Sequence, residues 1–246
     1  MKLSALRAPV PAGLADRILA STGPVDDYAA VDGPVGPLLV AWSRLGISLV
    51  IPGQDEVALA DTVRERLDRR VRRTSVAPPG LLTALRSGRT ARLEVDLRGR
   101  SDFERAVLTA ARRIPTGEVR SYSWVAAAIG RPGAVRAVGT ALGRNPVPVV
   151  VPCHRVVRSD GSAGDYVFGA PMKRDLLRTE GLDLERVEGF GSRGVQFLGS
   201  DTTRVFCVPS CREARRITAV HRIVFRSSSS AVAADFRPCR HCTPTP

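Results

Sequence analysis

The sequence predicts three folded parts in series: an α/β lobe, a mostly helical lobe with a helix-turn-helix pattern, and a small α+β module built on four cysteines. Short apolar runs split by turn residues, followed by a helical pattern, predict the first lobe. Two short helical patterns joined by a glycine-containing turn predict the second. Four of the five cysteines lie after residue 200, in two close pairs. The predicted boundaries are 1–27 for a weakly ordered lead-in, 28–98 for the α/β lobe, 99–185 for the helical lobe, 186–200 for a linker and 201–246 for the module.

The composition favours a protein that binds a polyanion. The chain has 246 residues, 43% of them hydrophobic, which is ample for a buried core. Its formal net charge of +13 makes nucleic acid the first candidate partner. The odd, clustered cysteine count is not that of a secreted disulfide framework, and we find neither a signal-peptide pattern nor an apolar run of about 18 residues. We therefore expect a cytoplasmic protein with no membrane partner.

The α/β lobe is predicted from local patterns. Leu38–Trp42 and Ile47–Ile51, separated by turn residues, predict a β-hairpin. Asp55–Arg73 places apolar residues at helical intervals and predicts a helix. For its basic end, Arg69–Arg73, a solvated helix face is favoured over a phosphate contact. Leu93–Leu97 alternates apolar and acidic residues, which predicts a strand that completes a small sheet.

The helical lobe begins at Asp102, which is a plausible N-cap. Ser121 opens a short helix, and a second helix follows from Ala134 to Arg144. Two helices joined in this way can be merely packed together, but the second one is rich in small residues around the single arginine Arg136. Small side chains let a helix backbone lie deep in a groove. The pair therefore indicates a DNA-binding helix-turn-helix.

Pro152–Val156 places a cysteine next to a histidine and an arginine. The thiolate is the nucleophilic form of cysteine, and a cationic or basic neighbour lowers the thiol pKa. Cys153 is thus a candidate nucleophile. The pentapeptide alone also fits a buried structural cysteine. A cysteine hydrolase that uses Cys153 and His154 is a further alternative, but it leaves the helix-turn-helix pattern and the basic charge unexplained.

The residues around Cys153 form a series of motifs in a fixed order. They are Ile114–Tyr122, Ala134–Gly139, Asn145–Pro148, Pro152–Val156, Gly164–Tyr166 and Leu176–Gly181. In this order and spacing, the chain closely resembles the O6-alkylguanine-DNA alkyltransferases, also called methylated-DNA-protein-cysteine methyltransferases, over roughly residues 28 to 183.

The resemblance implies a ribonuclease-H-like N-terminal lobe and an alkyltransferase lobe. It implies a monomeric, nucleoid-associated DNA repair enzyme whose partner is double-stranded DNA with alkylated bases. The alkyl group of O6-alkylguanine, and also of O4-alkylthymine, passes to Cys153 after the base is flipped out of the stack. The product is a thioether, a very poor leaving group, so each protein molecule reacts once. No organic cofactor is required, because the alkylated base is the donor.

The same resemblance implies the catalytic roles. Cys153 accepts the alkyl group, His154 acts as a base through a water, and Glu180 orients the histidine. Asn145 holds the active-site turn, because its side chain can bond backbone groups across it. Tyr122 crowds the phosphate and donates a hydrogen bond to the flipped guanine.

The resemblance also implies the substrate-binding residues. Arg136 takes the place of the flipped base in the stack. Arg155 and Val156 shape the guanine pocket, and Tyr166 forms one of its walls. Val167–Gly169 departs from the pattern of the family after this tyrosine.

The C-terminal cysteines predict a metal site. Cys207 and Cys211 are followed by Cys239 and Cys242, and two close pairs of soft thiolates are what a tetrahedral zinc ion requires. A redox or disulfide pair is the alternative. We expect one zinc ion in a site of four cysteines, and the glycine-rich stretch Glu188–Gly194 as the linker before it.

The strings Phe206–Cys211 and Phe236–Cys242 also resemble the metal-binding domain of the adaptive-response (Ada) family. The resemblance implies that Cys207 is both a zinc ligand and a second methyl acceptor, for the methyl group of DNA phosphotriesters. Two alternatives remain for this module: a structural DNA anchor, or a methylation-responsive DNA-binding regulator.

Overall fold

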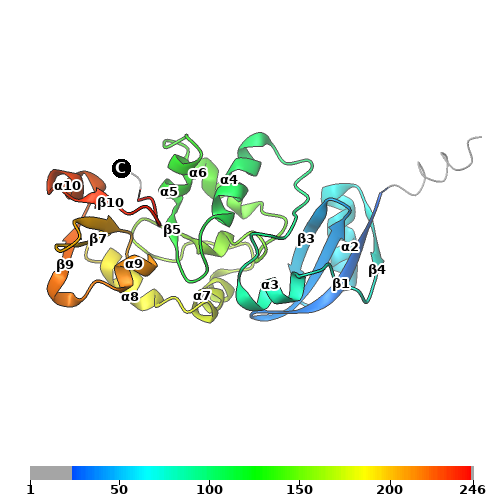
Figure 1. Cartoon of the computed structure of the whole chain (residues 1–246). Helices are drawn as coiled ribbons and strands as arrows, with labels where there is room; N and C mark the ends of the chain where they lie inside the picture. Colours follow the sequence, from blue (N-terminus) through cyan, green and yellow to red (C-terminus); the bar gives the residue numbers. More distant parts are fainter. Residues whose placement is uncertain (1–23, 245–246) are drawn as a thin grey trace, which may run out of the picture.

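The computed structural model describes residues 24–244, which form three parts in a row (Figure 1). A β-sheet lobe lies at one end, the helical lobe in the middle and the four-cysteine module at the other end. The predicted combination of mixed sheets and helices is confirmed. Most of the predicted lead-in, residues 1–23, lies outside the described residues.

The first sheet has the strand order β3-β2-β1-β4. Its strands are β1 (Val25–Gly33), β2 (Gly36–Ser43), β3 (Gly46–Pro52) and β4 (Arg70–Arg73). Because β1 begins at Val25, the lobe starts earlier than the predicted residue 28. The predicted hairpin is formed by β2 and β3, with Val40 opposite Val50. Gly46 turns between them at a φ of +123°, where an added Cβ would lie 2.4 Å from the Glu94 backbone.

The predicted helix from Asp55 to Arg73 is too long. Helix α2 (Glu56–Leu67) ends where Asp68 adopts a left-handed φ of 52°, and Arg70–Arg73 pairs with β1 as a parallel edge strand. The basic segment is therefore not a solvated helix face. Its first residue, Arg69, is buried and forms ion pairs of 3.1 Å with Asp26 and 2.8 Å with Asp96.

The strand predicted for Leu93–Leu97 is also wrong. The segment contributes only one isolated parallel bridge, between Val95 and Ile47. The carboxylate of Asp96 is buried and binds Arg69 and Arg98 instead of facing solvent. Strand β4 is the fourth strand of the sheet, at the β1 edge, whereas Leu93–Leu97 lies beside β3 at the opposite edge. A short helix, α3 (Leu81–Ser87), lies between the two segments in sequence.

The helical lobe shares the largest hydrophobic core with the first sheet, which contributes Val31, Val40 and Val50. Ser101, not Asp102, is the N-cap of its first helix, because Ser101 and Glu104 form a reciprocal capping box. Its elements are α4 (Asp102–Arg112), β5 (Arg120–Ser121), α5 (Tyr122–Ala128), α6 (Val135–Gly143), the 3-10 turn η2 (Cys153–Arg155), β6 (Val156–Val157), α7 (Ala170–Thr179) and α8 (Leu184–Gly191). The two short strands β5 and β6 pair in parallel, and this pairing places Arg120 opposite Val156.

The four-cysteine module has its own sheet, in the order β10-β8-β7-β9. Its elements are β7 (Phe197–Ser200), β8 (Val205–Cys207), α9 (Arg212–Arg215), the 3-10 turn η3 (Ala219–His221), β9 (Arg222–Phe225), α10 (Ser228–Ala233) and β10 (Arg237–Pro238). The predicted linker, residues 186–200, is wrong. Most of it belongs to α8 and β7, and the aromatic ring of Phe190 is buried against the cysteine cluster.

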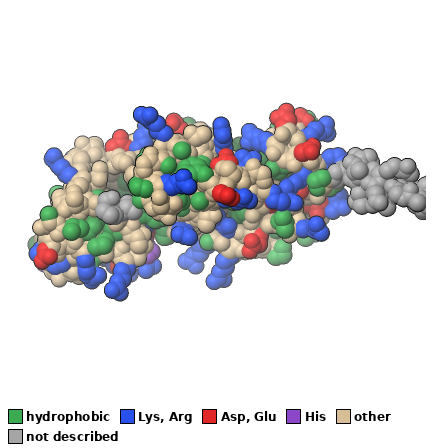
Figure 2. Space-filling model, turned by 90° about the horizontal axis from the view of Figure 1, so that it is seen from above, with side chains coloured by type: hydrophobic (Ala, Val, Ile, Leu, Met, Phe, Trp, Pro, Cys, Tyr) green, Lys and Arg blue, Asp and Glu red, His purple; other side chains and the backbone are tan. Residues whose placement is uncertain are grey.

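Basic side chains are spread over all three parts on the face seen in Figure 2. Within residues 24–244, no helix has both the length and the apolar character needed to cross a membrane.

Candidate active site and metal centre

Cys153 is held by a turn that Asn145 braces. The side-chain nitrogen of Asn145 donates to the Val151 carbonyl at 3.0 Å and to the Cys153 sulfur at 3.1 Å. Its oxygen accepts from the Val147 amide at 3.0 Å, so the side chain bonds across the turn as predicted. Val149, between these residues, has a φ of 71°, which is rare for a β-branched residue. Such strained positions tend to occur at functional sites.

The Cys153 thiol is not activated in the way the sequence suggested. Burial raises its pKa to about 11, and the hydrogen bond from Asn145 and the charge of Lys173 oppose this only in part. The neighbouring arginine does not lower this pKa, because the Arg155 guanidinium is directed to Glu180. At neutral pH the resting sulfur is therefore protonated, and reaction requires a group that removes the proton.

His154 and Glu180 form the predicted pair. Nε2 of His154 lies 2.9 Å from Oε1 of Glu180, and both side chains are largely buried. Burial lowers the pKa of His154, so the imidazole is neutral at neutral pH. Burial disfavours the Glu180 carboxylate, but hydrogen bonds from His154 and Arg155 outweigh it and hold its pKa at about 2. The other ring nitrogen of His154, Nδ1, is buried without a partner among the described residues and is free to accept a proton.

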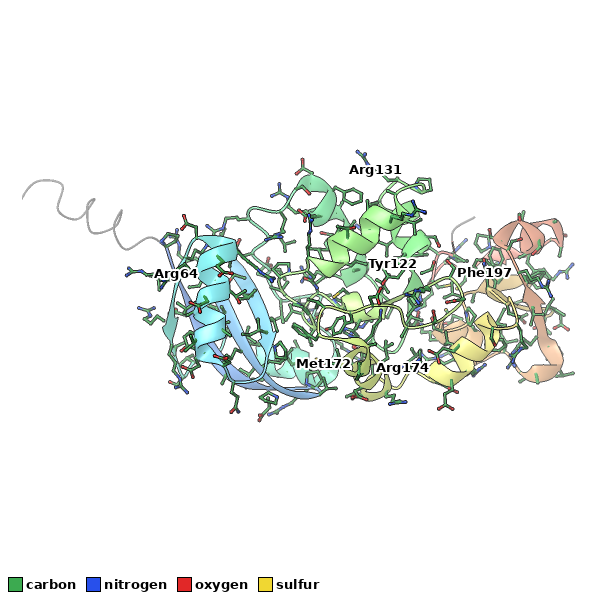
Figure 3. The ribbon with its side chains drawn as sticks, turned by 180° about the vertical axis from the view of Figure 1, so that it is seen from behind. Arg64, Tyr122, Arg131, Met172, Arg174 and Phe197 are labelled. Carbon is green, nitrogen blue, oxygen red and sulfur yellow. The ribbon has the colours of Figure 1, made fainter. Side chains whose placement is uncertain are left out.

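A cavity of about 580 Å³ opens onto Cys153. Tyr122, Arg136 and Tyr166 line it, so the structure brings three predicted substrate residues to the cysteine. Figure 3 shows Tyr122 within the helical lobe, near the middle of the molecule. The hydroxyl of Tyr166 is buried without a hydrogen-bond partner within residues 24–244, and its ring meets His154 edge to face at 6.1 Å.

Arg155 and Val156 do not line this cavity, contrary to the prediction. The guanidinium of Arg155 turns away from Cys153 and donates to the carbonyl oxygens of Ile114 and Gly88, each at 2.7 Å. Arg155 thus ties the active-site turn to the β-sheet lobe. Val156 is fully buried in strand β6.

The sequence-based prediction missed Lys173, whose side chain is fully buried. Its ammonium donates to the carbonyl oxygens of Val156 at 2.6 Å and Asp165 at 3.3 Å. Burial lowers its pKa to about 8, and the nearby Cys153 and Asp165 oppose this effect. A signal was present, because Lys173 lies three and four positions before Leu176 and Leu177 and so shares their buried helix face.

Helices α5 and α6 pack together beside the cavity. Arg136 and Ala137 in α6 are exposed, whereas Val138 and Ala141 are buried in the core. One face of α6 therefore points outward with Arg136 at the mouth of the cavity. Gly139, also in the cavity lining, leaves room beside the Tyr122 ring, which lies 3.9 Å from where its Cβ would be.

The four C-terminal cysteines form one cluster. The sulfur atoms of Cys207, Cys211, Cys239 and Cys242 all lie within 4.8 Å of one another and are buried. A tetrahedral zinc ion with Zn–S bonds of about 2.3 Å needs sulfur atoms about 3.8 Å apart. All four cysteines are free of disulfide bonds. The donor set therefore fits zinc, and the predicted redox or disulfide alternative is not supported.

Cys207 also lines a cavity of about 770 Å³ on the surface of the module. Thr202 and Thr203 contribute hydroxyl groups to it, and three exposed arginines, Arg216, Arg237 and Arg240, contribute positive charge. Of the four cluster cysteines, Cys239 is the other one in this lining.

The module is joined to the helical lobe by buried hydrogen bonds. The Ser210 hydroxyl donates to the Val119 carbonyl at 2.8 Å and accepts from the Val119 amide at 3.1 Å. Glu118 is buried and accepts hydrogen bonds from the Arg212 amide and from Arg120, and it lies 2.9 Å from His241. Local sequence patterns carry no signal for this interface, because it joins residues about 90 to 120 positions apart.

Two family models match the chain. Residues 102–182 match the 6-O-methylguanine DNA methyltransferase DNA binding domain, and residues 191–245 match the metal binding domain of Ada. A methylated-DNA–protein-cysteine methyltransferase of Methanosarcina acetivorans is 35% identical over 159 residues, which cover 63% of this chain and 97% of that protein. The bifunctional transcriptional activator/DNA repair enzyme Ada of Escherichia coli is 37% identical over 169 residues, but only 46% of its length is matched.

A solved structure is similar as well. The Mycobacterium tuberculosis OGT in complex with DNA has a TM-score of 0.50 and 34% identity, covering 63% of this chain and 92% of that one. Fold and site together define a cysteine-dependent transferase that is joined to a thiolate metal centre. The chain belongs to the methylated-DNA–protein-cysteine methyltransferase family, and its C-terminal part is an Ada-type metal-binding domain.

Proposed function

We propose that the chain repairs double-stranded DNA by moving the alkyl group of O6-alkylguanine, and also of O4-alkylthymine, onto the Cys153 sulfur. The observation that carries the proposal is the cavity of about 580 Å³ that exposes Cys153 between Tyr122 and Tyr166, with Arg136 at its mouth. A flipped base can enter such a cavity, whereas a base in the stack cannot meet the sulfur. The chain then works as a monomer on chromosomal DNA, at the nucleoid.

The transfer follows from the protonation states of the site. The Cys153 thiol, with its pKa of about 11, gives its proton to neutral His154 through a water at Nδ1. Glu180 stabilises the imidazolium that forms. The sulfur attacks the alkyl carbon, the carbon–oxygen bond breaks, and its electron pair stays on the guanine. The Tyr122 hydroxyl, which burial keeps protonated by raising its pKa, donates a hydrogen bond to the departing guanine, and the proton that His154 took from Cys153 returns through water to the guanine. The thioether cannot be cleaved by this site, so the reaction is single-turnover.

We assign the lobes accordingly. The lobe that contains the four-stranded sheet, residues 25–98, is proposed as a ribonuclease-H-like lobe, and residues 99–185 as the catalytic and DNA-binding lobe. One zinc ion is held by Cys207, Cys211, Cys239 and Cys242, and it would keep these thiols deprotonated.

Mass spectrometry of the intact protein tests the main activity. Incubation with a duplex that contains O6-methylguanine should add the mass of one methyl group, and peptide mapping should place it on Cys153. A Cys153→Ala variant should gain no methyl group from this lesion while it still binds DNA. Removal of the lesion by that variant in a one-to-one amount would overturn the proposal.

A second activity is supported by the cavity at Cys207. Arg216 is paired with Glu213 of the same lining, but Arg237, Arg240 and the two threonines suit a phosphate group. A sulfur at the edge of this cavity can meet a methyl group on phosphate oxygen. We propose that Cys207 accepts the methyl group of methylphosphotriesters. The test uses the Cys153→Ala variant, loaded with zinc, and DNA that carries methylphosphotriesters. If no methyl group maps to Cys207, the module is a structural DNA anchor.

A further inference from the structure

A basic groove lies where the module, the helical lobe and the loop after α3 approach one another. Its volume is about 620 Å³, and residues from all three parts line it. Arg89 comes from the loop after α3, Arg113 from the end of α4, and Arg212 and Arg215 from α9 of the module. None of its lining residues belongs to the cavity at Cys153. The module completes the groove, because it supplies Arg212, Arg215 and His241 to the lining.

The groove is strongly positive. Arg89, Arg113 and Arg215 are exposed, and within residues 24–244 none of the three forms an ion pair with a carboxylate. The only acidic residue in the lining is Glu118, which is buried and already accepts hydrogen bonds from Arg120 and the Arg212 amide. Arg212 is paired with Glu213, which lies outside the lining, so the unneutralised charge of the groove comes from Arg89, Arg113 and Arg215.

The floor of the groove is formed by arginines that are already occupied. Arg112 donates to three backbone carbonyl groups of residues 90–93, and Arg155 binds Glu180. The bonds of Arg112 and Arg155 fix the backbone that lines the groove, whereas Arg89, Arg113 and Arg215 remain free to bind a ligand.

The groove leads to Cys207. His241 lines it, and His241 also lines the cavity at Cys207 and a smaller cavity of about 430 Å³ that includes Arg113. The three hollows thus lie side by side around one residue. The exposed arginines continue across them, from Arg89 and Arg113 to Arg216 and Arg240.

The lining also excludes several kinds of ligand. Apart from the imidazole of His241, it contains no aromatic side chain on which a base could stack, so it is not built for a nucleotide or a single strand. A row of arginines without stacking groups suits a sequence-independent contact with phosphates. The row is supplied by three separate parts of the chain, which favours an extended polyanion over a small anion.

We propose that this groove binds the phosphodiester backbone of duplex DNA and guides it to Cys207. This role rests on the proposed phosphotriester activity of Cys207. Arg89 and Arg113, which lie outside the module, bind the DNA whose phosphotriester reacts there. The sheet lobe and the helical lobe thereby extend the DNA surface of the module. Transfer to Cys153 uses the separate surface around Arg136.

A pair of matched double variants tests the groove in the full-length, zinc-loaded protein. The test variant is Arg89→Ala with Arg113→Ala. The control is Arg64→Ala with Arg66→Ala, which removes the same charge from two exposed residues of α2, far from the module (Figure 3). Each lost phosphate contact lowers the slope of log affinity against log salt by about 0.9, so the test variant should lose roughly 1.8 from this slope. The control should keep the wild-type slope. Equal slopes for both variants would show that Arg89 and Arg113 do not contact DNA phosphates.

Methyl transfer gives the second readout. With limiting DNA, the test variant should methylate Cys207 about tenfold more slowly than the control, and Cys153 at the same rate. Replacement of both residues by lysine should largely restore the Cys207 rate, because a point charge is enough for a phosphate contact. Equal slowing at both cysteines would contradict the proposal that the groove guides DNA to Cys207 and not to Cys153. If wild-type Cys207 accepts no methyl group, the phosphotriester activity fails, and the salt slope still decides whether the groove binds DNA.

Discussion

The side-chain nitrogen of Asn145 lies 3.1 Å from the sulfur of Cys153. The same nitrogen donates to the Val151 carbonyl, so one amide group fixes the turn and contacts the nucleophile. Because the surrounding burial raises the pKa of Cys153 to about 11, this contact is one of the few that favour the thiolate. The residue is itself buried, and its loss cannot be replaced by bulk water.

Asn145→Ala should slow methyl transfer about 10- to 100-fold, since a hydrogen bond to a charged group contributes roughly 1.5–3 kcal/mol. The second-order rate constant with O6-methylguanine duplex measures this effect. Arg144→Ala, at an exposed neighbouring position, is the control for changes in DNA binding. A wild-type rate for Asn145→Ala would show that the turn does not need this amide.

Arg136→Ala should slow repair in duplex DNA more than transfer from free O6-benzylguanine. The free base needs no flipping, whereas an extruded base leaves a gap that costs a few kcal/mol. We expect a loss of roughly 10-fold or more with the duplex and less than about twofold with the free base. Parallel single-turnover assays with both substrates measure the ratio. Equal losses with both substrates would show that Arg136 does not act in base flipping.

The ion pair of Glu180 should make stability depend on pH. Its pKa is about 2 in the folded protein and near 4.5 without the fold, so the folded state favours the carboxylate. This contribution, on the order of 3 kcal/mol, is complete above about pH 4.5 and is lost as the pH falls towards 2. Glu180→Gln should therefore be less stable than wild type near neutral pH, and the difference should shrink in acid.

Urea unfolding at about pH 7 and about pH 3 measures this difference. Glu185→Gln, an exposed residue of α8, serves as the control and should behave like wild type at both values. A stability gap for Glu180→Gln that does not change with pH would contradict the assigned ion pair.

Ser210→Ala should weaken the junction between the module and the helical lobe. The substitution leaves the buried amide and carbonyl groups of Val119 without their partner, at a cost of about 1–3 kcal/mol. We expect a lower melting temperature and earlier release of zinc on heating, followed by a zinc-binding dye. Ser229→Ala, in the exposed first turn of α10, is the control. Unchanged melting and zinc release would show that the junction does not couple the two parts.

Local patterns predicted much of the fold. The β2-β3 hairpin, helices α5 and α6, and the four-cysteine cluster were predicted because apolar period, turn residues and ligand spacing act over short distances. The errors fell where distant residues compete. Leu93–Leu97 alternates like a strand, but its Asp96 forms a buried ion pair with Arg69, and the segment contributes only one bridge, to Ile47 of β3.

For the active site, the sequence by itself determined which residue types occur and in what order. Asn145 contacts Cys153, and Glu180 at the end of α7 contacts His154, as the sequence predicted. Only the tertiary structure decided what each residue faces. Arg155 turns to Glu180 and the Gly88 carbonyl, Lys173 is buried near Cys153, and Ser210 joins the module to Val119. The direction of a side chain depends on packing and hydrogen bonds with partners far away in the chain, and local sequence spacing carries no information about those partners.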